Sequence, residues 1–358
     1  MSAKHILILA GGTGGHIYPA IALANTFIEH NHTVSWIGTG NDLEESVINK
    51  KNINFYSISS KGYRGKRLLS KMIFLLTFPV RLIKALLIVK QVKPDVTIGM
   101  GGYVTLFGGI ISRIFRIPLV LHEQNAILGG TNKILLKLAS KVCFGIPLDR
   151  NQNHSINYKI TGNPIRDELL NFNKPNSDLS NPFKLLVLGG SQGASYLNKN
   201  LPKVIEDLDH QMKFDIVHQS GANKQHEVSY EGLANVTSAK IYPYMHNPAI
   251  FYEWADIVIC RAGAMTITEI MATSNLAIFI PYPHAIENHQ FYNAKKLVDD
   301  GAAFLVEEGN HFKSQIQLLL SDIFKHKINI EGMRRKARTM FYADANETIM
   351  NICLAEAK

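Results

Sequence analysis

Two segments of the chain, far apart in sequence, share one pattern: an apolar strand, a glycine-rich turn and a helix. The first reads HILILAGGTGGHIYPAIALANTF from residue 5, and the second reads FKLLVLGGSQGASYLNKNL from residue 183. Neither strand alternates with polar residues, which indicates strands buried on both faces of a parallel sheet. Such a sheet needs helices on both sides, so each segment predicts the opening of a separate α/β domain.

The rest of the sequence supports two Rossmann-like domains. The 358 residues exceed one ordinary core, since a domain usually takes ~150 residues. Runs such as DVTIGM and PLVLHE alternate with helical patterns, as in a doubly wound sheet. Residues 147–182 are rich in Asn and Pro and predict a linker. We therefore expect an α/β protein with two parallel sheets that face each other across a cleft, with ligands at the carboxyl ends of the strands.

Composition and charge narrow the class of partner. The net charge of +9 favours an anionic partner, whether a nucleotide, a nucleic acid or a membrane lipid. The three cysteines, Cys143, Cys260 and Cys353, lie in apolar stretches without metal-ligand spacing, which predicts reduced, buried thiols in the cytoplasm. The first residues lack the pattern of a signal peptide, so we expect no export.

One segment raises the question of a membrane. Residues 64–93 read RGKRLLSKMIFLLTFPVRLIKALLIVKQVK, and Pro79, Arg81 and Lys84 interrupt the apolar run. The segment therefore lacks the ~20 apolar residues that a spanning helix needs. Its basic residues are typical of a helix on an anionic membrane surface. A helix buried beside a parallel sheet explains the pattern equally well.

The first glycine-rich loop, Gly11 to His16, offers an anion site at a helix N-terminus. It is not the dinucleotide fingerprint, because Ile17 stands where the third glycine belongs, and the chain has no P-loop motif. His16 has the chemistry of a general base that deprotonates a hydroxyl. A helix-capping or packing histidine is an equally good interpretation of the loop alone.

Other polar residues follow predicted strands. Residues 122–125, HEQN, come directly after PLVL, where substrate contacts belong, and we prefer that interpretation to a solvated loop. GMGGY, residues 99–103, is better explained as a backbone turn. Ser191 and Gln192 suit a diphosphate, and Glu269 suits a ribose diol or a solvated helix surface. The single D-x-D, Asp207 and Asp209, lies in a charged helix, so we expect neither a metal nor a cofactor.

Taken together, the motifs GGTGGH, GMGGY, HEQN with TNK, TGNPIR, GGSQGA, HQSG, CRAGAMTITE and HQFYNA resemble the MurG family. The resemblance extends from about residue 5 to about residue 305, with the motifs in family order and spacing. It implies a GT-B fold and transfer of N-acetylglucosamine from its UDP donor to lipid I, which gives lipid II. It implies an acceptor and membrane-facing domain over residues 1–162 and a UDP-sugar domain over 163–340. The helical pattern of residues 341–358 predicts a last helix that packs back on the first domain.

The resemblance also carries over site residues. His16 is the best candidate for the catalytic base, with His122 and Glu123 next. Acceptor contacts are expected at Tyr103, His122, Glu123 and His289. Met245 departs from the isoleucine of many relatives, and His289 with Gln290 replaces a glutamine pair, so which of these two contacts the sugar stays open. The expected donor-site residues are Thr13, Gly14, Gly15, Asn125, Arg166, Ser191, Met245, Ala264, Met265, Thr266, Ile267, Thr268, Glu269 and Gln290.

The resemblance implies an inverting displacement by the 4-hydroxyl of N-acetylmuramic acid, at the cytoplasmic face of the bacterial inner membrane. The implied partners are UDP-N-acetylglucosamine, lipid I and the anionic membrane surface, with no nucleic acid. Alternatives are another GT-B enzyme, such as a lipid glycosyltransferase or a UDP-N-acetylglucosamine 2-epimerase, a nucleotide-binding regulator, or a nicotinamide-dependent dehydrogenase. The missing third glycine disfavours the dehydrogenase.

Overall fold

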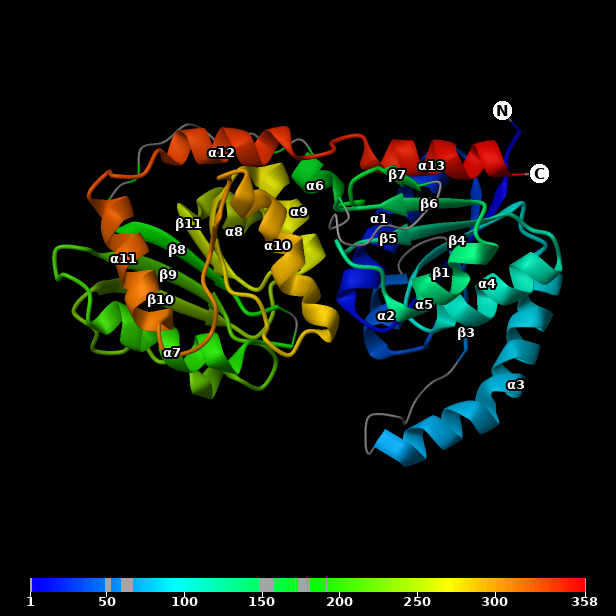
Figure 1. Cartoon of the computed structure of the whole chain (residues 1–358), viewed down its shortest axis with the longest axis horizontal. Coiled ribbons are helices and arrows are strands. Elements are labelled where there is room, and N and C mark those ends of the chain that lie inside the picture. Colours follow the sequence, from blue (N-terminus) through cyan, green and yellow to red (C-terminus); the bar gives the residue numbers. More distant parts are fainter. Residues whose placement is uncertain are drawn as a thin grey trace. The chain divides into compact units, whose positions relative to one another are not determined.

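The chain forms two compact units, seen in the computed structural model of Figure 1. Residues 1–166 and 342–358 make the first unit, and residues 167–341 make the second. The sequence-based prediction places the boundaries at 162 and 340. The structure describes residues 2–48, 53–58, 67–147, 158–170, 172, 179, 181–190 and 192–357, and of residues 47 and 67–75 it describes the backbone alone.

The first unit is built on a seven-stranded sheet in the order β3-β2-β1-β4-β5-β6-β7, with every neighbouring pair parallel. Its strands are β1 (His5–Ala10), β2 (Thr33–Gly38), β3 (Asn54–Ser57), β4 (Val96–Gly101), β5 (Leu119–Glu123), β6 (Lys141–Phe144) and β7 (Tyr158–Ile160). Its α-helices are α1 (Gly14–Glu29), α2 (Asp42–Ile48), α3 (Arg67–Val92), α4 (Val104–Ile114), α5 (Gly130–Leu135) and α13 (Ala345–Glu356), and a 3₁₀ turn covers Leu136–Leu138.

Helices cover both faces of this sheet because its central strands are apolar on both sides. Ile6 and Ile8 of β1 pack in one cluster with α1 and α13. Leu7 and Leu9, which point to the other face, pack with α3 and α4. In Figure 1, α3 and α4 accordingly lie together beside the strands of this unit. Within the described part of the chain, no helix combines the length and the apolar character that crossing a membrane requires.

The last helix, α13, is part of the first unit's core, although more than 150 residues of the second unit precede it. Ile349, Met350 and Cys353 are buried in the same cluster as β1 and α1. His30 at the end of α1 also lies 3.7 Å from Glu347, an exposed pair that contributes little. Apolar burial therefore attaches the C-terminal segment to this unit.

The second unit repeats the architecture with six strands in the order β10-β9-β8-β11-β12-β13, again all parallel. Its strands are β8 (Phe183–Leu188), β9 (Phe214–Gln219), β10 (Val236–Tyr242), β11 (Ile257–Cys260), β12 (Leu276–Phe279) and β13 (Phe304–Leu305). Its α-helices are α6 (Asp167–Leu170), α7 (Ser195–Glu206), α8 (Ala249–Trp254), α9 (Ala264–Thr273), α10 (His289–Asp299), α11 (Phe312–Phe324) and α12 (Ile330–Thr339), and 3₁₀ turns cover Gln225–Glu227 and Ile286–Asn288.

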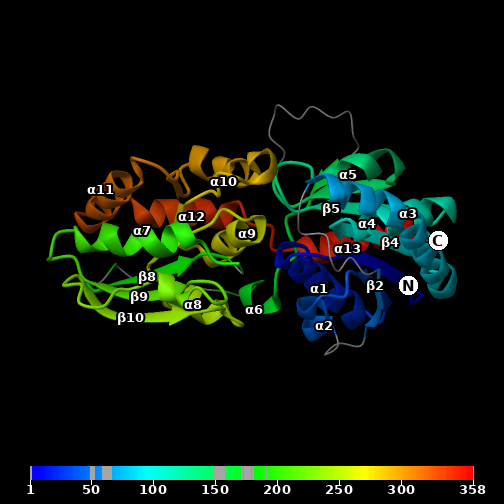
Figure 2. The ribbon, with the colours of Figure 1, turned by 90° about the horizontal axis from the view of Figure 1, so that it is seen from below.

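Both faces of the second sheet are covered as well. Leu185 and Val187 of β8 share a core cluster with α7 and α11. Leu186, which points to the opposite face, is fully buried too, and α8 contacts β8 while α9 contacts α8 and α12. Figure 2 shows α7 and α8 on opposite sides of the strands. The predicted fold class of two Rossmann-like α/β domains with parallel sheets is confirmed, whereas the cleft stays a prediction.

Strand order locates the ligand edge of each unit. In the first sheet the order reverses between β1 and β4, and in the second it reverses between β8 and β11. Ligands of such sheets bind outside the carboxyl ends of the strands at this switch point. The loops after these four strands are residues 11–13, 102–103, 189–194 and 261–263, and three of them are rich in glycine.

We predict that the first unit loses much of its stability when a buried apolar side chain of α13 is truncated. Ile349→Ala should lower the free energy of unfolding by about 2–5 kcal/mol, because Ile349 is fully buried and its truncation leaves a cavity. Asn351→Ala, at an exposed position of the same helix, is the matched control and should change it by about 0.5 kcal/mol or less. Urea unfolding measures both, and equal effects of the two variants would contradict the packing argument.

Candidate functional site

The glycine loop after β1 is held in place by one buried carboxylate. Glu44 accepts hydrogen bonds from the backbone N–H groups of Gly12 at 3.0 Å, Thr39 at 2.6 Å and Gly40 at 2.8 Å. It also accepts one from the Thr39 hydroxyl at 2.7 Å. A buried carboxylate needs such donors, and here they come from the loops after β1 and β2. Glu44 therefore fixes the backbone from which α1 starts.

The two glycine motifs of the first unit meet backbone to backbone. A Cβ on Gly102, whose φ is +78°, would collide with the carbonyl oxygen of Gly11. A Cβ on Gly101, whose φ is +107°, would lie 2.5 Å from Nδ1 of His16. Glycine is thus required at both positions, by backbone conformation and by space. The GMGGY motif thus spans the end of β4 and the turn into α4, and it packs directly on the loop that precedes His16.

His16 lies half-buried in the first turn of α1. Its Nδ1 is 3.1 Å from Oε1 of Gln124. Nε2 of Gln124 lies 2.9 Å from the carbonyl oxygen of Met100 and 3.1 Å from Nδ1 of His122. His16 is therefore oriented by a side chain from the end of β5, through a chain of hydrogen bonds inside one unit.

His122 and Glu123 are buried, with 0% and 2% of their surface exposed. His122 bonds through Nε2 to the carbonyl oxygen of Gly162 at 3.0 Å, and its burial lowers its pKa to about 4. Glu123 accepts from Asn125 Nδ2 at 3.0 Å, Gly129 N–H at 2.8 Å and Asn132 Nδ2 at 2.8 Å. These bonds favour positioning roles over the acceptor contacts expected from the sequence.

The other predicted residues of the first unit gather around the same edge. Thr13 is exposed at the N-cap of α1, followed by Gly14 and Gly15. Asn125 follows β5. The Arg166 guanidinium stacks 4.3 Å from the ring centre of Tyr18 on α1. Tyr103 is the N-cap residue of α4, and the guanidinium of buried Arg81 from α3 lies 5.9 Å from the centre of its ring.

The second unit repeats the close approach of two glycine loops. A Cβ on Gly193, after β8, would collide with the carbonyl oxygen of Ser220, and one on Gly221 would collide with Gly193. Gln219 then links the neighbouring segments, since its Nε2 donates to the carbonyl of Gly190 at 2.9 Å. Its Oε1 accepts from the N–H of Met245 at 3.2 Å. Ser191, which was predicted to contact the donor, lies outside the described residues.

A buried polar network supports this loop. His218 of β9 bonds through Nδ1 to the Tyr230 hydroxyl at 2.9 Å and through Nε2 to Oδ1 of Asn198 at 3.0 Å. Asn198 in turn donates to the carbonyl of Ser220 and to Glu227, both at 3.0 Å. Burial lowers the pKa of His218 to about 4. A neutral histidine therefore ties β9 to the start of α7.

Helix α9 presents two different sets of the predicted donor residues. Ala264, Ile267 and Thr268 are buried, so their contribution is limited to backbone groups. Met265, Thr266 and Glu269 are half-buried, and Oε2 of Glu269 accepts from the Tyr252 hydroxyl at 2.8 Å. Met245 is 4% exposed, and its N–H is already bonded to Gln219.

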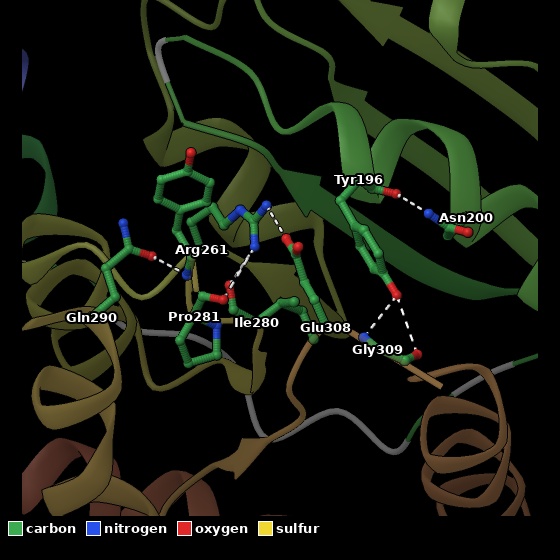
Figure 3. Close-up of polar contacts among 9 residues, drawn as sticks. Tyr196, Asn200, Arg261, Ile280, Pro281, Gln290, Glu308 and Gly309 are labelled. Atoms are coloured by element: carbon green, nitrogen blue, oxygen red, sulfur yellow. Dashed lines mark hydrogen bonds and ion pairs between the residues drawn. The ribbon is translucent and has the colours of Figure 1, made fainter. Parts of the chain in front are cut away.

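Figure 3 shows the polar contacts beside β11, β12 and the start of α10. Arg261 pairs with Glu308 and donates to the carbonyl oxygens of Ile280 at 3.1 Å and Pro281 at 3.3 Å. Its guanidinium lies 5.5 Å from the centre of the Tyr282 ring. These contacts hold the backbone of residues 280–282 at the ends of the strands.

The two open candidates for the sugar contact both lie in the first turn of α10. Oε1 of Gln290 accepts from the N–H of Tyr282 at 2.9 Å (Figure 3), and Nδ1 of His289 lies 2.9 Å from the carbonyl of Ile286. In each residue, one polar side-chain atom is therefore already hydrogen-bonded to the backbone. No group of three His, Cys, Asp or Glu side chains suited to a metal occurs in the ranges that the structure describes.

Residue-type reasoning missed Glu44, Gln124 and Arg261 as organisers of these loops. A signal was available for Gln124, because alternation along HEQN places His122 and Gln124 on one side and Glu123 and Asn125 on the other. Within each pair, the two side chains are indeed hydrogen-bonded to each other. Glu44 also had a local signal, because it stands three residues after Asn41 at the start of α2 and the two are hydrogen-bonded to each other. The bond of Glu44 to Gly12 and the partners of Arg261 had no such signal, since they lie in segments distant in sequence.

The surface of α3 has one packed and one exposed apolar side. Ala85 and Val89 are buried in the core. Leu76, Val80, Ile83 and Leu87 form a stripe on the other side and are 75%, 55%, 58% and 59% exposed, at the three- and four-residue spacing of one helix face. Ile114 and Phe115 at the end of α4 are 62% and 41% exposed. The nearby exposed basic residues on α3 and after α4 are Lys84, Lys90, Arg113 and Arg116.

Comparison with known proteins identifies the family. The Glycosyltransferase family 28 N-terminal domain matches residues 6–144, and the family 28 C-terminal domain matches residues 184–349. The UDP-N-acetylglucosamine--N-acetylmuramyl-(pentapeptide) pyrophosphoryl-undecaprenol N-acetylglucosamine transferase of Pseudomonas syringae pv. syringae is 38% identical over 99% of both chains. The chain belongs to the MurG family. Its relative from Pseudomonas syringae pv. tomato is 39% identical, also over 99% of both chains.

Solved structures agree with this assignment. The crystal structure of Acinetobacter baumannii MurG matches with a TM-score of 0.77 and 31% identity, over 98% of this chain and 99% of that one. CalG4, the calicheamicin glycosyltransferase, matches with a TM-score of 0.70 at 13% identity, over 99% and 98%, which shows the fold alone. The predicted family, the GT-B type of fold and the glycosyltransferase class are thereby confirmed, and the residue roles stay predictions.

We predict that acid destabilises the protein through His122 and His218. Both pKa values are about 4 in the folded state and ~6.5 when unfolded, so the unfolded chain binds more protons below pH 6.5. Their stabilising contribution is complete above that pH and is lost as the pH falls toward 4. The free energy of unfolding should fall by on the order of 2 kcal/mol for each histidine when the pH is lowered from 7.5 to 5.

Urea unfolding at the two pH values measures this loss. His218→Gln keeps an acceptor for Tyr230 and a donor for Asn198, and it should remove part of the pH dependence. His226→Gln, at an exposed position, is the matched control and should retain the dependence. An unchanged pH dependence in His218→Gln would show that His218 is not the titrating group.

Proposed function

We propose that this chain transfers N-acetylglucosamine from UDP-N-acetylglucosamine to the 4-hydroxyl of the N-acetylmuramic acid of lipid I, which forms lipid II. The observation that carries this proposal is the match to relatives that bear this activity in their names, at 38–39% identity over 99% of their length. The geometry of His16 supports it, because a half-buried imidazole on a glycine loop suits the deprotonation of a hydroxyl.

The proposed reaction is one inverting displacement. The acceptor oxygen forms a bond to the anomeric carbon, and the bond from that carbon to the UDP oxygen breaks with its electrons on the diphosphate. The acceptor proton passes to the imidazole of His16. Amides that open α7 and α9 stabilise the leaving diphosphate, because N–H groups at a helix N-terminus favour an anion.

The second unit supplies the proposed donor site. Glu269 is suited to a ribose diol, since its carboxylate is half-buried and oriented by the Tyr252 hydroxyl. The main chain around Met245 is suited to the base, through its carbonyl and through packing. Gln290 retains its amide nitrogen for a sugar hydroxyl, whereas its oxygen is bonded to the backbone of Tyr282.

We further propose that α3 docks on the anionic cytoplasmic surface of the inner membrane and so brings the lipid acceptor to the first unit. The exposed stripe of Leu76, Val80, Ile83 and Leu87 supports this, as do the basic residues around it. Apolar side chains would enter the headgroup boundary while lysines and arginines contact anionic lipids. Arg64 and Lys66 of the predicted basic cluster lie outside the described residues.

The activity is tested by transfer of radiolabelled sugar from UDP-N-acetylglucosamine to a lipid I analogue. His16→Ala should lower kcat by ~10²- to 10⁴-fold, the usual contribution of a positioned base. Calorimetry should still detect UDP-N-acetylglucosamine binding, which is the control for folding. Near-normal turnover in the folded variant would remove His16 from the mechanism, and no transfer by the unaltered chain would refute the proposed activity.

Membrane docking is tested with vesicles of phosphatidylglycerol and phosphatidylethanolamine. Ile83→Asp combined with Leu87→Asp should weaken vesicle binding by about tenfold or more, because two exposed apolar side chains lose their burial in the headgroup region. The matched control is Leu318→Asp on α11 of the second unit. Leu318 is 62% exposed, and this variant should bind normally. Equal co-sedimentation of all three proteins would contradict docking through α3.

A further inference from the structure

Two backbone carbonyls and three side chains of the first unit form one continuous network of hydrogen bonds that ends at His16. His122 Nε2 lies 3.0 Å from the carbonyl oxygen of Gly162. His122 Nδ1 lies 3.1 Å from Nε2 of Gln124, which is also 2.9 Å from the carbonyl oxygen of Met100. Oε1 of Gln124 lies 3.1 Å from Nδ1 of His16.

The direction of every hydrogen bond in this network follows from its two carbonyl ends. A carbonyl oxygen only accepts, so Nε2 of His122 is protonated and donates its hydrogen bond to the carbonyl of Gly162. His122 is neutral near pH 7 because burial lowers its pKa to about 4. Its Nδ1 is therefore an acceptor and takes one amide hydrogen of Gln124, whose other amide hydrogen goes to Met100.

The amide nitrogen of Gln124 therefore faces Met100 and His122, which leaves its oxygen facing His16. An oxygen acceptor requires a proton on Nδ1 of His16. The lone pair of a neutral His16 then lies on Nε2, at the opposite side of the ring. Packing adds to this constraint, because the main chain of Gly101 lies against the Nδ1 side of the ring.

We propose that Gln124 is a positioning residue, which keeps the proton of neutral His16 on Nδ1 and so presents Nε2 as the base. The inference rests on the role of His16 in the proposed function. It extends that role by naming the basic nitrogen and the residue that selects it. Gln124 is 2% exposed and acts through His16, without a contact to substrate of its own.

The tautomer of His16 is measured directly by nitrogen-15 NMR of the whole chain with labelled histidine, assigned with His16→Ala. In the unaltered protein at pH 8, we expect Nδ1 of His16 to be protonated and Nε2 to show the resonance of an unprotonated nitrogen. A neutral His16 with its proton on Nε2 overturns the inference. This measurement needs no substitution at Gln124, so it does not depend on how a variant folds.

Gln124→Met, which keeps the length of the side chain but removes its oxygen, tests the consequence for turnover. We expect protonation of His16 to shift toward Nε2 and kcat to fall by about tenfold or more, though less than the ~10²- to 10⁴-fold loss for removal of the base itself. The KM for UDP-N-acetylglucosamine should change by less than about twofold, since donor binding does not use this nitrogen. Thr97→Val, at another buried polar position within β4, controls for general loosening of the sheet and should keep the His16 tautomer.

Two results with the Gln124→Met variant would also overturn the inference. The first is an unchanged tautomer in Gln124→Met, and the second is a shifted tautomer with unaltered kcat. The proposed function fails separately: in that case His16→Ala itself turns over normally, or the unaltered chain transfers no sugar, whatever the tautomer. NMR thus tests the positioning of His16, and the transfer assay tests its use.

Discussion

The close approach of two glycine loops at the carboxyl ends of neighbouring strands in each sheet is the constraint on which the candidate site depends. In the first unit Gly102 packs on the carbonyl of Gly11, and Gly101 packs on the ring of His16. In the second, Gly193 packs on Ser220 and Gly221. Side chains in these places would separate the loops and move the helix starts. Because the loops touch, the N–H groups of α1 and the side chains after β5 reach the same edge of the sheet.

The sequence predicted most of the fold because its signals are local. Apolar strands without alternation, followed by glycine turns, indicate parallel strands wherever they occur in the chain. The attachment of α13 is different, since the helix is held by β1 and α1, more than 300 residues away in sequence. The helical pattern predicted this helix and its return, but periodicity does not say which strands and helices cover it.

The site could be predicted in its position but only partly in its roles. HEQN was expected to contact substrate because it follows a strand, and it does lie at the ligand edge of the sheet. Burial then separates its members, since His122 and Glu123 are enclosed by main-chain groups of residues 129 and 162. The carbonyl of Gly162 comes from a segment 40 residues away, and the residue types near HEQN do not indicate it. Of the four residues that the sequence presents as ligands, His122 and Gln124 belong to the hydrogen-bond network that reaches His16.

The difference between Glu123 and Gln124 explains why an amide, and not a carboxylate, orients His16. Glu123 is surrounded by N–H donors of Asn125, Gly129 and Asn132, so its buried charge is compensated. Gln124 faces the carbonyl of Met100, which a carboxylate would repel. An amide satisfies that carbonyl with one hydrogen and His122 with the other, and its oxygen is left for His16. The acceptor toward the imidazole is therefore supplied without burying a second negative charge beside the first.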